Sequence, residues 1–117
     1  MSPVHVVAIA DHEIPTRPAL RIAPGDVAEV GENDTTWPAF VFVTTASGTG
    51  WVPERHLGTE RPTTTVVTAY NTRELPVSAQ DELTVHEDDP ESGWSWCTNR
   101  DGHAGWVPHT VLRNSED

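Results

Sequence analysis

The four residues Gly50-Trp51-Val52-Pro53 recur as Gly105-Trp106-Val107-Pro108 at an interval of 55 residues. A sequence that repeats at a fixed interval is typical of a chain built from similar structural units. We therefore expect this chain of 117 residues to consist of two repeats, each about 55 residues long.

The similarity between the two repeats extends well before the tetrapeptides. Residues 19–26 align with 74–81 at the same interval, and residues 40–44 align with 94–98 at an interval one residue shorter. Single-residue differences of this kind are typical of surface loops. The repeat predicts one domain at 1–59, a short linker at 60–65 and a second domain at 66–117.

Short segments rich in β-branched and aromatic residues alternate with turn residues throughout the chain. The segments expected to form strands lie at 4–10, 20–22, 27–30, 40–44, 65–70, 75–77, 83–85, 94–98 and 105–107, with a further strand beginning at Trp51. No apolar residues recur at helical spacing over three turns. The pattern predicts an all-β barrel or sandwich.

The composition of the chain excludes some classes of partner. It has 18 acidic and 7 basic residues, giving a formal net charge of −11. Binding to nucleic acid or to an anionic membrane needs a basic surface, so we expect neither partner. The single cysteine, Cys97, cannot form an intramolecular disulfide, and the first residues lack the basic and apolar regions of a signal peptide. We therefore expect a cytoplasmic protein.

The order of motifs in the second repeat resembles the Src-homology 3 (SH3) family, in particular the short SH3-like domains of bacterial proteins. The matching motifs are Glu74-Leu75, Asp81-Glu82-Leu83-Thr84-Val85, an acidic segment expected to form a loop from Glu87 to Gly93, Gly93-Trp94 and the second tetrapeptide. The first repeat resembles the family through Gly25-Asp26-Val27, Phe40 and the first tetrapeptide. The resemblance implies an all-β fold of two tandem SH3-like five-stranded barrels packed together.

The resemblance also implies a shallow aromatic groove that binds proline-containing peptides. In the second repeat it implies a peptide-binding set made of Tyr70, Glu87, Asp88, Asp89, Trp94, Trp96 and Pro108. In the first repeat it implies a weaker set made of Phe40, Pro53 and His56. His56 and Val111 replace the tyrosine that the family usually has three residues after the proline, and Ala10 aligns with Tyr70.

These features favour a non-enzymatic adaptor. We expect it to dock an extended, basic or proline-containing segment of another protein across Tyr70, Trp94 and Pro108, with the acidic segment raising the association rate. The alternative is a structural or assembly protein, such as an accessory subunit, whose aromatic faces are buried between the repeats or in a homo-oligomer. A third alternative, an inhibitor that mimics an acidic ligand, depends on the net charge alone.

No pattern in the sequence indicates catalysis, a metal site or a cofactor. Cys97 lies on an expected strand and has no local signature of a base and an orienting group, which a cysteine nucleophile needs. His103 and His109, with Asp101, do not have the spacing of a standard metal site. The chain also lacks a glycine-rich phosphate loop. We therefore expect no enzyme activity, no metal and no cofactor.

Overall fold

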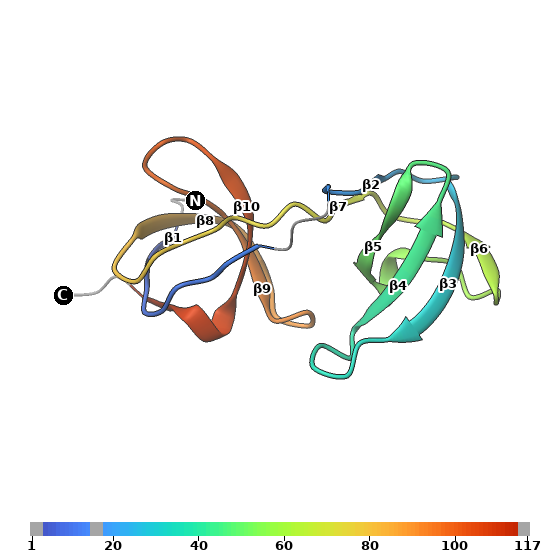
Figure 1. Ribbon diagram of the computed structural model, residues 1–117, viewed down its shortest axis with the longest axis horizontal. Coiled ribbons are helices and arrows are strands. Elements are labelled where there is room, and N and C mark those ends of the chain that lie inside the picture. The colour runs from blue at the N-terminus through green and yellow to red at the C-terminus, as the bar shows by residue number, and fades with distance from the viewer. Residues whose placement is uncertain (1–3, 15–17, 115–117) are drawn as a thin grey trace. The chain divides into compact units, whose positions relative to one another are not determined.

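The computed structural model describes residues 4–14 and 18–114, and these residues form strands and turns (Figure 1). The strands are β1 (Val4–Ala8), β2 (Arg21–Ile22), β3 (Val27–Asn33), β4 (Phe40–Thr45), β5 (Gly48–Pro53), β6 (Thr63–Thr65), β7 (Tyr70–Asn71), β8 (Glu82–Asp89), β9 (Trp94–Thr98), β10 (Ala104–Pro108) and β11 (Leu112–Asn114). Two short 3-10 helices, η1 (Glu54–His56) and η2 (His109–Val111), follow the tetrapeptides. The described residues contain no α-helix, which confirms the predicted all-β class.

The described strands form three sheets, and in neither of the two larger sheets does the last strand pair with the first. The strand orders of the three sheets are β10-β9-β8-β1-β11, β5-β4-β3-β6 and β2-β7. Because the two larger sheets do not return to their first strand, they are open, and the two closed five-stranded barrels expected from the resemblance are not confirmed. Among the described residues, no helix has the length and apolar character needed to span a membrane.

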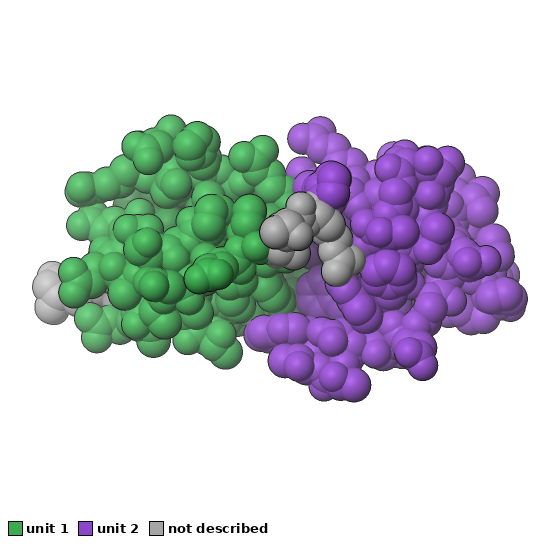
Figure 2. Space-filling model, viewed as in Figure 1, with its two compact units in different colours: residues 1–17, 73–117 green, residues 18–72 purple. Residues whose placement is uncertain are grey.

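The chain divides into two compact units, and their limits differ from those of the sequence repeats (Figure 2). Unit 1 comprises Met1–Arg17 and Arg73–Asp117, and unit 2 comprises Pro18–Thr72. The predicted linker at 60–65 thus belongs to unit 2, where part of it forms β6. The predicted domains 1–59 and 66–117 therefore remain a hypothesis about the sequence repeats, and their residues 1–3, 15–17 and 115–117 lie outside the described ranges.

The units differ from the repeats because the first segment of each repeat pairs with the other repeat. β1 comes from the first repeat and lies between β8 and β11 of the second. Conversely, β6 lies in the predicted linker and pairs with β3 of the first repeat, and Val66, the first residue of the second repeat, continues this pairing by a bridge to Leu57. Equivalent hydrogen bonds hold both segments. The Ala8 amide donates to the Asp81 carbonyl at 2.9 Å, and the Val66 amide donates to the Asp26 carbonyl at 2.8 Å. We call this arrangement the segment exchange.

Each unit has its own apolar core, and the exchanged segments contribute to both. The core of unit 1 consists of Val6, Ala8, Leu75, Val77, Leu83, Cys97 and Val107. The core of unit 2 consists of Leu20, Ile22, Ala28, Val41, Val43, Val52, Leu57 and Val66. Each exchanged segment therefore loses water-exposed apolar surface in the unit that receives it, which stabilises the pairing.

The same aspartate turn precedes the longest hairpin of each unit. Asp26 accepts a hydrogen bond from the Ala23 amide through its side chain, and Asp81 does the same for the Ser78 amide, both at 2.9 Å. Aspartate favours such turns because its short carboxylate reaches a nearby backbone amide. The two turns support the predicted alignment of residues 23–26 with 78–81.

Candidate functional site

Trp94 lies where three segments of unit 1 meet. At the start of β9 it pairs with Asp89 of β8 on one side and with Pro108 of β10 on the other. The ring of His12 meets the Trp94 ring edge-on, with a centroid distance of 5.6 Å and an interplanar angle of 73°. Trp94 remains partly exposed, whereas Pro108 is buried. Of these two predicted residues, Trp94 is therefore the one whose side chain remains partly accessible to solvent.

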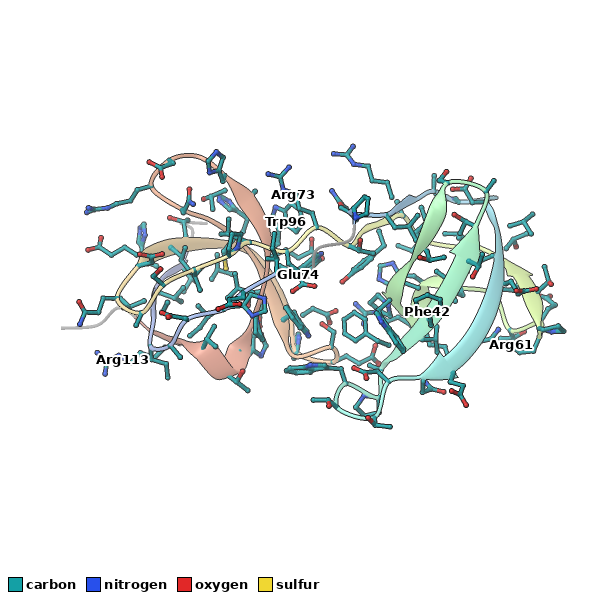
Figure 3. All side chains as sticks on the ribbon, in the orientation of Figure 1. Phe42, Arg61, Arg73, Glu74, Trp96 and Arg113 are labelled. Atoms are coloured by element: carbon teal, nitrogen blue, oxygen red, sulfur yellow. The ribbon has the colours of Figure 1, made fainter. Side chains whose placement is uncertain are left out.

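His12 is held beside Trp94 by contacts on both its backbone and its side chain. The His12 amide donates to the Val77 carbonyl at 2.8 Å, and the Val77 amide donates back at 3.1 Å. Nε2 of His12 lies 2.9 Å from Oε1 of Glu74, which is labelled in Figure 3. Sequence reasoning missed this pair because the two residues are 62 positions apart and no local pattern connects them.

A second histidine and carboxylate pair joins η2 to strand β8. Nε2 of His109 is 2.7 Å from Oδ1 of Asp88 and 3.1 Å from Oγ of Ser95, which also donates to Asp88 at 2.9 Å. A hydrolytic triad places the carboxylate and the hydroxyl on opposite ring nitrogens, but here both approach Nε2. Ser95 is also buried. This cluster can pair charges and fix side chains, and it does not have the geometry for nucleophilic attack.

The acidic segment expected to be a loop is the end of strand β8. Glu87, Asp88 and Asp89 pair with Trp96, Ser95 and Trp94 of β9, and only residues 90–93 form the turn. Cross-strand contacts with large side chains outweigh the low strand propensity of acidic residues. Glu87 and Asp88 are exposed and Asp89 is buried. Glu87 and Asp88 are therefore the accessible carboxylates on the strand, and Glu91 in the turn is exposed as well.

Trp96 has an aromatic partner within unit 1. It lies opposite Trp106 in β10, and the two rings meet edge-on with centroids 5.4 Å apart. Phe42 and Trp51 repeat the arrangement in unit 2 at 5.2 Å. Such cross-strand pairs stabilise a sheet. Trp96 is labelled in Figure 3 and is partly exposed, so its role toward a ligand stays a prediction.

Tyr70 belongs to unit 2, whereas Trp94 and Pro108 belong to unit 1. The Tyr70 ring meets the His56 ring edge-on, with centroids 5.0 Å apart. Nδ1 of His56 lies 3.1 Å from the Ala69 carbonyl, which fixes the imidazole. The segment exchange therefore groups Tyr70 with His56, and the proposed surface of Tyr70, Trp94 and Pro108 does not fall within one compact unit.

His12 is the structural counterpart of Tyr70 in unit 1. Tyr70 lies opposite Ile22, and His12 lies opposite Val77, the residue 55 positions after Ile22. The sequence alignment placed Ala10 at this position, and the strand register corrects it by two residues. The error arose because the loop after the first strand differs in length between the two repeats. Alignment by sequence alone therefore could not determine which residue of the first strand corresponds to Tyr70.

The remaining predicted residues of the first repeat are buried. Phe40 and Pro53 pair with each other across β4 and β5, as Trp94 and Pro108 do across β9 and β10. Phe40 is 7% exposed, and the Pro53 side chain is fully buried. Tyr70 is therefore the partly exposed aromatic residue in the predicted set of unit 2.

Cys97 is unsuited to act as a nucleophile. It lies in the core of unit 1, where burial raises the pKa of its thiol to about 12. The reactive thiolate is thus strongly disfavoured at neutral pH. In the parts of the chain that the structure describes, no group of three or more His, Cys, Asp or Glu side chains is arranged to hold a metal ion.

Comparison with known families gives a match in the second repeat. Residues 63–115 match the family described as the variant SH3 domain, a kind of domain that generally mediates interactions between proteins. A search of curated proteins found no match to the chain. The matched range begins at Thr63, which lies in unit 2, so the segment exchange divides this continuous sequence domain between the two units.

Proposed function

We propose that this protein, which carries a variant SH3 domain at residues 63–115, is a non-enzymatic adaptor that binds an extended segment of another protein. The observation that carries the proposal is the partly exposed Trp94, fixed between Asp89 and Pro108 and contacted by His12. The expected cytoplasmic location is part of this proposal.

The chemistry around Trp94 fits a ligand that is both extended and basic. A polyproline segment is already extended when free, so it loses little entropy when it docks on an aromatic ring. Glu87 and Asp88 are exposed on the neighbouring strand and offer carboxylates to an arginine or lysine of the ligand. The net charge of −11 attracts the same class of segment over longer distances.

Unit 2 offers a second and weaker surface. Tyr70 is partly exposed there, but Phe40, Pro53 and His56, its predicted companions, are buried. We therefore assign the main binding role to unit 1.

The test is a peptide-display selection against the full chain, with random peptides that contain proline and arginine. The affinity of a selected peptide is then measured by fluorescence anisotropy for the wild type and for Trp94→Ala. We expect Trp94→Ala to weaken binding at least about tenfold, because a central tryptophan commonly dominates such contacts. Circular dichroism checks that the variant is folded.

The matched control is Trp51→Ala, which removes a partly exposed tryptophan from unit 2. We expect it to keep the affinity of the wild type. The proposal is wrong if a folded Trp94→Ala binds the peptide as well as the wild type does, or if the selection yields no peptide.

A structural or assembly role is the second candidate, and the segment exchange favours it. Because the first segments fit equivalent positions in the two repeats, they could complete the same positions in a second copy of the chain. Light scattering after size-exclusion chromatography would then show a dimer whose share grows when the protein is refolded at higher concentration. A monomer under all such conditions would exclude this role for the exchanged segments.

A further inference from the structure

We propose that binding at the Trp94 surface is sensitive to protons, and that protonation of His12 and His109 weakens the binding of a basic segment. This inference rests on the proposed function, because it concerns regulation of the same site. The observation behind it is that two carboxylates of unit 1, Glu74 and Asp88, each lie within hydrogen-bonding distance of an imidazole Nε2.

The first pair is the less exposed of the two. The side chains of His12 and Glu74 are 15% and 24% exposed, and their closest atoms are 2.9 Å apart. Charges that are partly removed from water interact more strongly than charges in bulk solvent. Because the His12 ring also contacts Trp94, a charge on this imidazole lies beside the surface that the ligand would cover.

The second pair joins η2 to the β8–β9 hairpin that carries Trp94. His109 directly follows Pro108, which pairs with Trp94, and Asp88 is the neighbour of Asp89 on β8. The side chains of His109 and Asp88 are 39% and 56% exposed, so solvent screens this pair more than the first. We therefore expect His12 to contribute more of the effect than His109.

The direction of the effect follows from the charges. Imidazole groups ordinarily gain a proton between about pH 8 and pH 5, whereas carboxylates ordinarily remain ionised in that range. Above this pH range, Glu74 and Asp88 present two negative charges to a basic segment. When both imidazoles are protonated, their positive charges compensate these carboxylates, and the attraction for a basic ligand falls.

Other charged groups near the two histidines do not reverse this direction. Those that are neighbours in the sequence are Asp11 and Glu13 for His12, Arg73 for Glu74, and Glu87 and Asp89 for Asp88, with Glu91 in the following turn. Carboxylate and guanidinium groups ordinarily keep their charge between about pH 5.5 and 7.5. These neighbouring groups therefore leave the direction of the expected effect unchanged.

The experiment measures the affinity of a selected arginine-containing peptide at about pH 5.5, 6.5 and 7.5 and constant ionic strength. For the wild type we expect binding to be about three- to tenfold weaker at the lowest pH than at the highest. The double variant His12→Gln, His109→Gln should bind the peptide with nearly the same affinity at the lowest and the highest pH. The ratio of these two affinities should thus approach one, even if the substitutions change the affinity itself. Glutamine keeps an amide that can donate a hydrogen bond to each carboxylate.

His86→Gln is the matched control. His86 lies on β8 of unit 1, and its Nε2 is 2.9 Å from Oγ1 of Thr98 rather than from a carboxylate. This variant should keep the pH ratio of the wild type. A peptide in which glutamine replaces each arginine should bind with little dependence on pH, because it carries no charge for the carboxylates to attract.

The outcomes separate this inference from the proposed function. If the peptide binds with the same affinity at all three pH values, or if the double variant keeps the full pH ratio, the inference is wrong and the adaptor function stands. If no peptide binds at any pH, the adaptor function itself is wrong.

Discussion

Unit 1 is assembled from two separate stretches of the chain, whereas unit 2 is one continuous stretch, residues 18–72. The two nevertheless use the same turn and the same tetrapeptide. Unit 2 contains all the strands of its own four-stranded sheet, but the five-stranded sheet of unit 1 needs β1 from the start of the chain. The comparison shows that similar local sequences do not determine which segment completes each core.

The largest effect should come from deleting residues 1–10, which removes β1. This strand lies between β8 and β11 and brings Val6 and Ala8 to the core of unit 1. We expect unit 1 to unfold and unit 2 to stay folded. Cys97 reports the change, because it is the one thiol of the chain and lies in the core of unit 1. A thiol reagent should react slowly with the wild type and rapidly with the deletion variant.

The control for this deletion is the fragment 18–72, which should fold alone and give the circular dichroism of a β protein. If Cys97 stays protected in the deletion variant, the prediction fails. Residues 63–70 would then have taken the place of β1 beside β8 and β11, in agreement with the family match that begins at Thr63.

The glycines of the two tetrapeptides should respond differently to the same substitution. A Cβ at Gly105 would lie 2.6 Å from backbone atoms of Glu74 and Leu75, whereas a Cβ at Gly50 would lie 3.3 Å or more from side-chain atoms of Leu20 and Thr72. Side chains can adjust by small rotations, but paired backbone cannot. We expect Gly105→Ala to lower the free energy of unfolding by about 3 kcal/mol and Gly50→Ala by about 1 kcal/mol or less.

Urea denaturation checks this difference when it is followed by nuclear magnetic resonance of amides in β9 and β10 for unit 1 and in β4 and β5 for unit 2. Each substitution should shift the transition of its own unit. Equal losses for the two variants would show that the backbone of Glu74 and Leu75 moves away from β10 at little cost.

The sequence predicted the strands better than their partners. The expected strand at 40–44 is β4, because its β-branched and aromatic residues favour a strand locally. The segment exchange left no such signal, because Val6-Val7 and Val66-Val67 carry the same apolar pattern and suit either core. Pairing between distant segments depends on loop geometry and on the whole core, which a local pattern does not contain.

Individual residues of the candidate site could likewise be predicted from the sequence, whereas their contacts with distant segments could not. Trp94, Glu87 and Asp88 could be selected from the motif order, and the structure places all three on the β8–β9 hairpin. The contact of His12 with Trp94 could not be foreseen, because it depends on the segment exchange. The assignment of Tyr70 and Trp94 to different units has the same cause.

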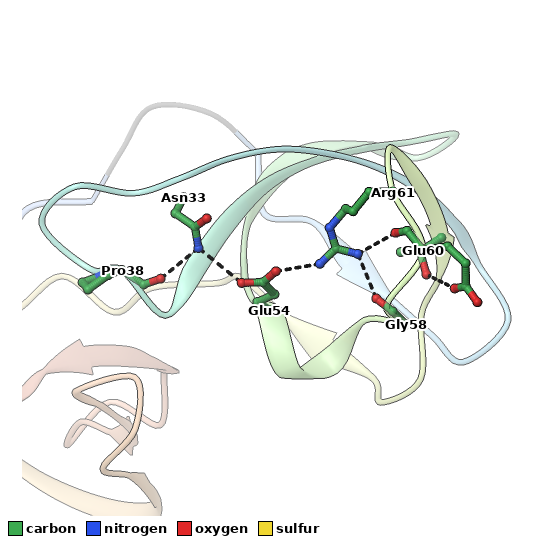
Figure 4. A network of polar contacts seen from close by, with 7 residues as sticks. Asn33, Pro38, Glu54, Gly58, Glu60 and Arg61 are labelled. Atoms are coloured by element: carbon green, nitrogen blue, oxygen red, sulfur yellow. Dashed lines mark hydrogen bonds and ion pairs between the residues drawn. The ribbon is translucent and has the colours of Figure 1, made fainter.

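The residues that follow the two tetrapeptides have different partners in the two units. His109 pairs with Asp88 in unit 1, whereas the equivalent Glu54 in unit 2 accepts a hydrogen bond from Arg61 at 2.7 Å (Figure 4). Asn33 donates to the other oxygen of Glu54 at 3.3 Å. The bond from Arg61, followed by the bond from Asn33, lowers the pKa of Glu54.

The smallest effect should therefore come from Arg61→Gln. Glu54 and Arg61 are 46% and 35% exposed, so we expect the free energy of unfolding of unit 2 to fall by only about 0.5 kcal/mol at neutral pH. Because the pKa of Glu54 is lower in the folded state, this contribution is present above the unfolded pKa and is lost as the pH falls through the folded pKa. The difference between wild type and variant should therefore begin to shrink below about pH 4.5, the ordinary pKa of this carboxyl, and disappear once the pH is below the lowered pKa of the folded state. Urea denaturation at several pH values measures this difference. The control is Arg100→Gln, which removes a more exposed pair with Glu82 and should leave the free energy of unfolding unchanged. A loss that persists in acid would show that Arg61 stabilises unit 2 through its bond to the Gly58 carbonyl rather than through the charge of Glu54.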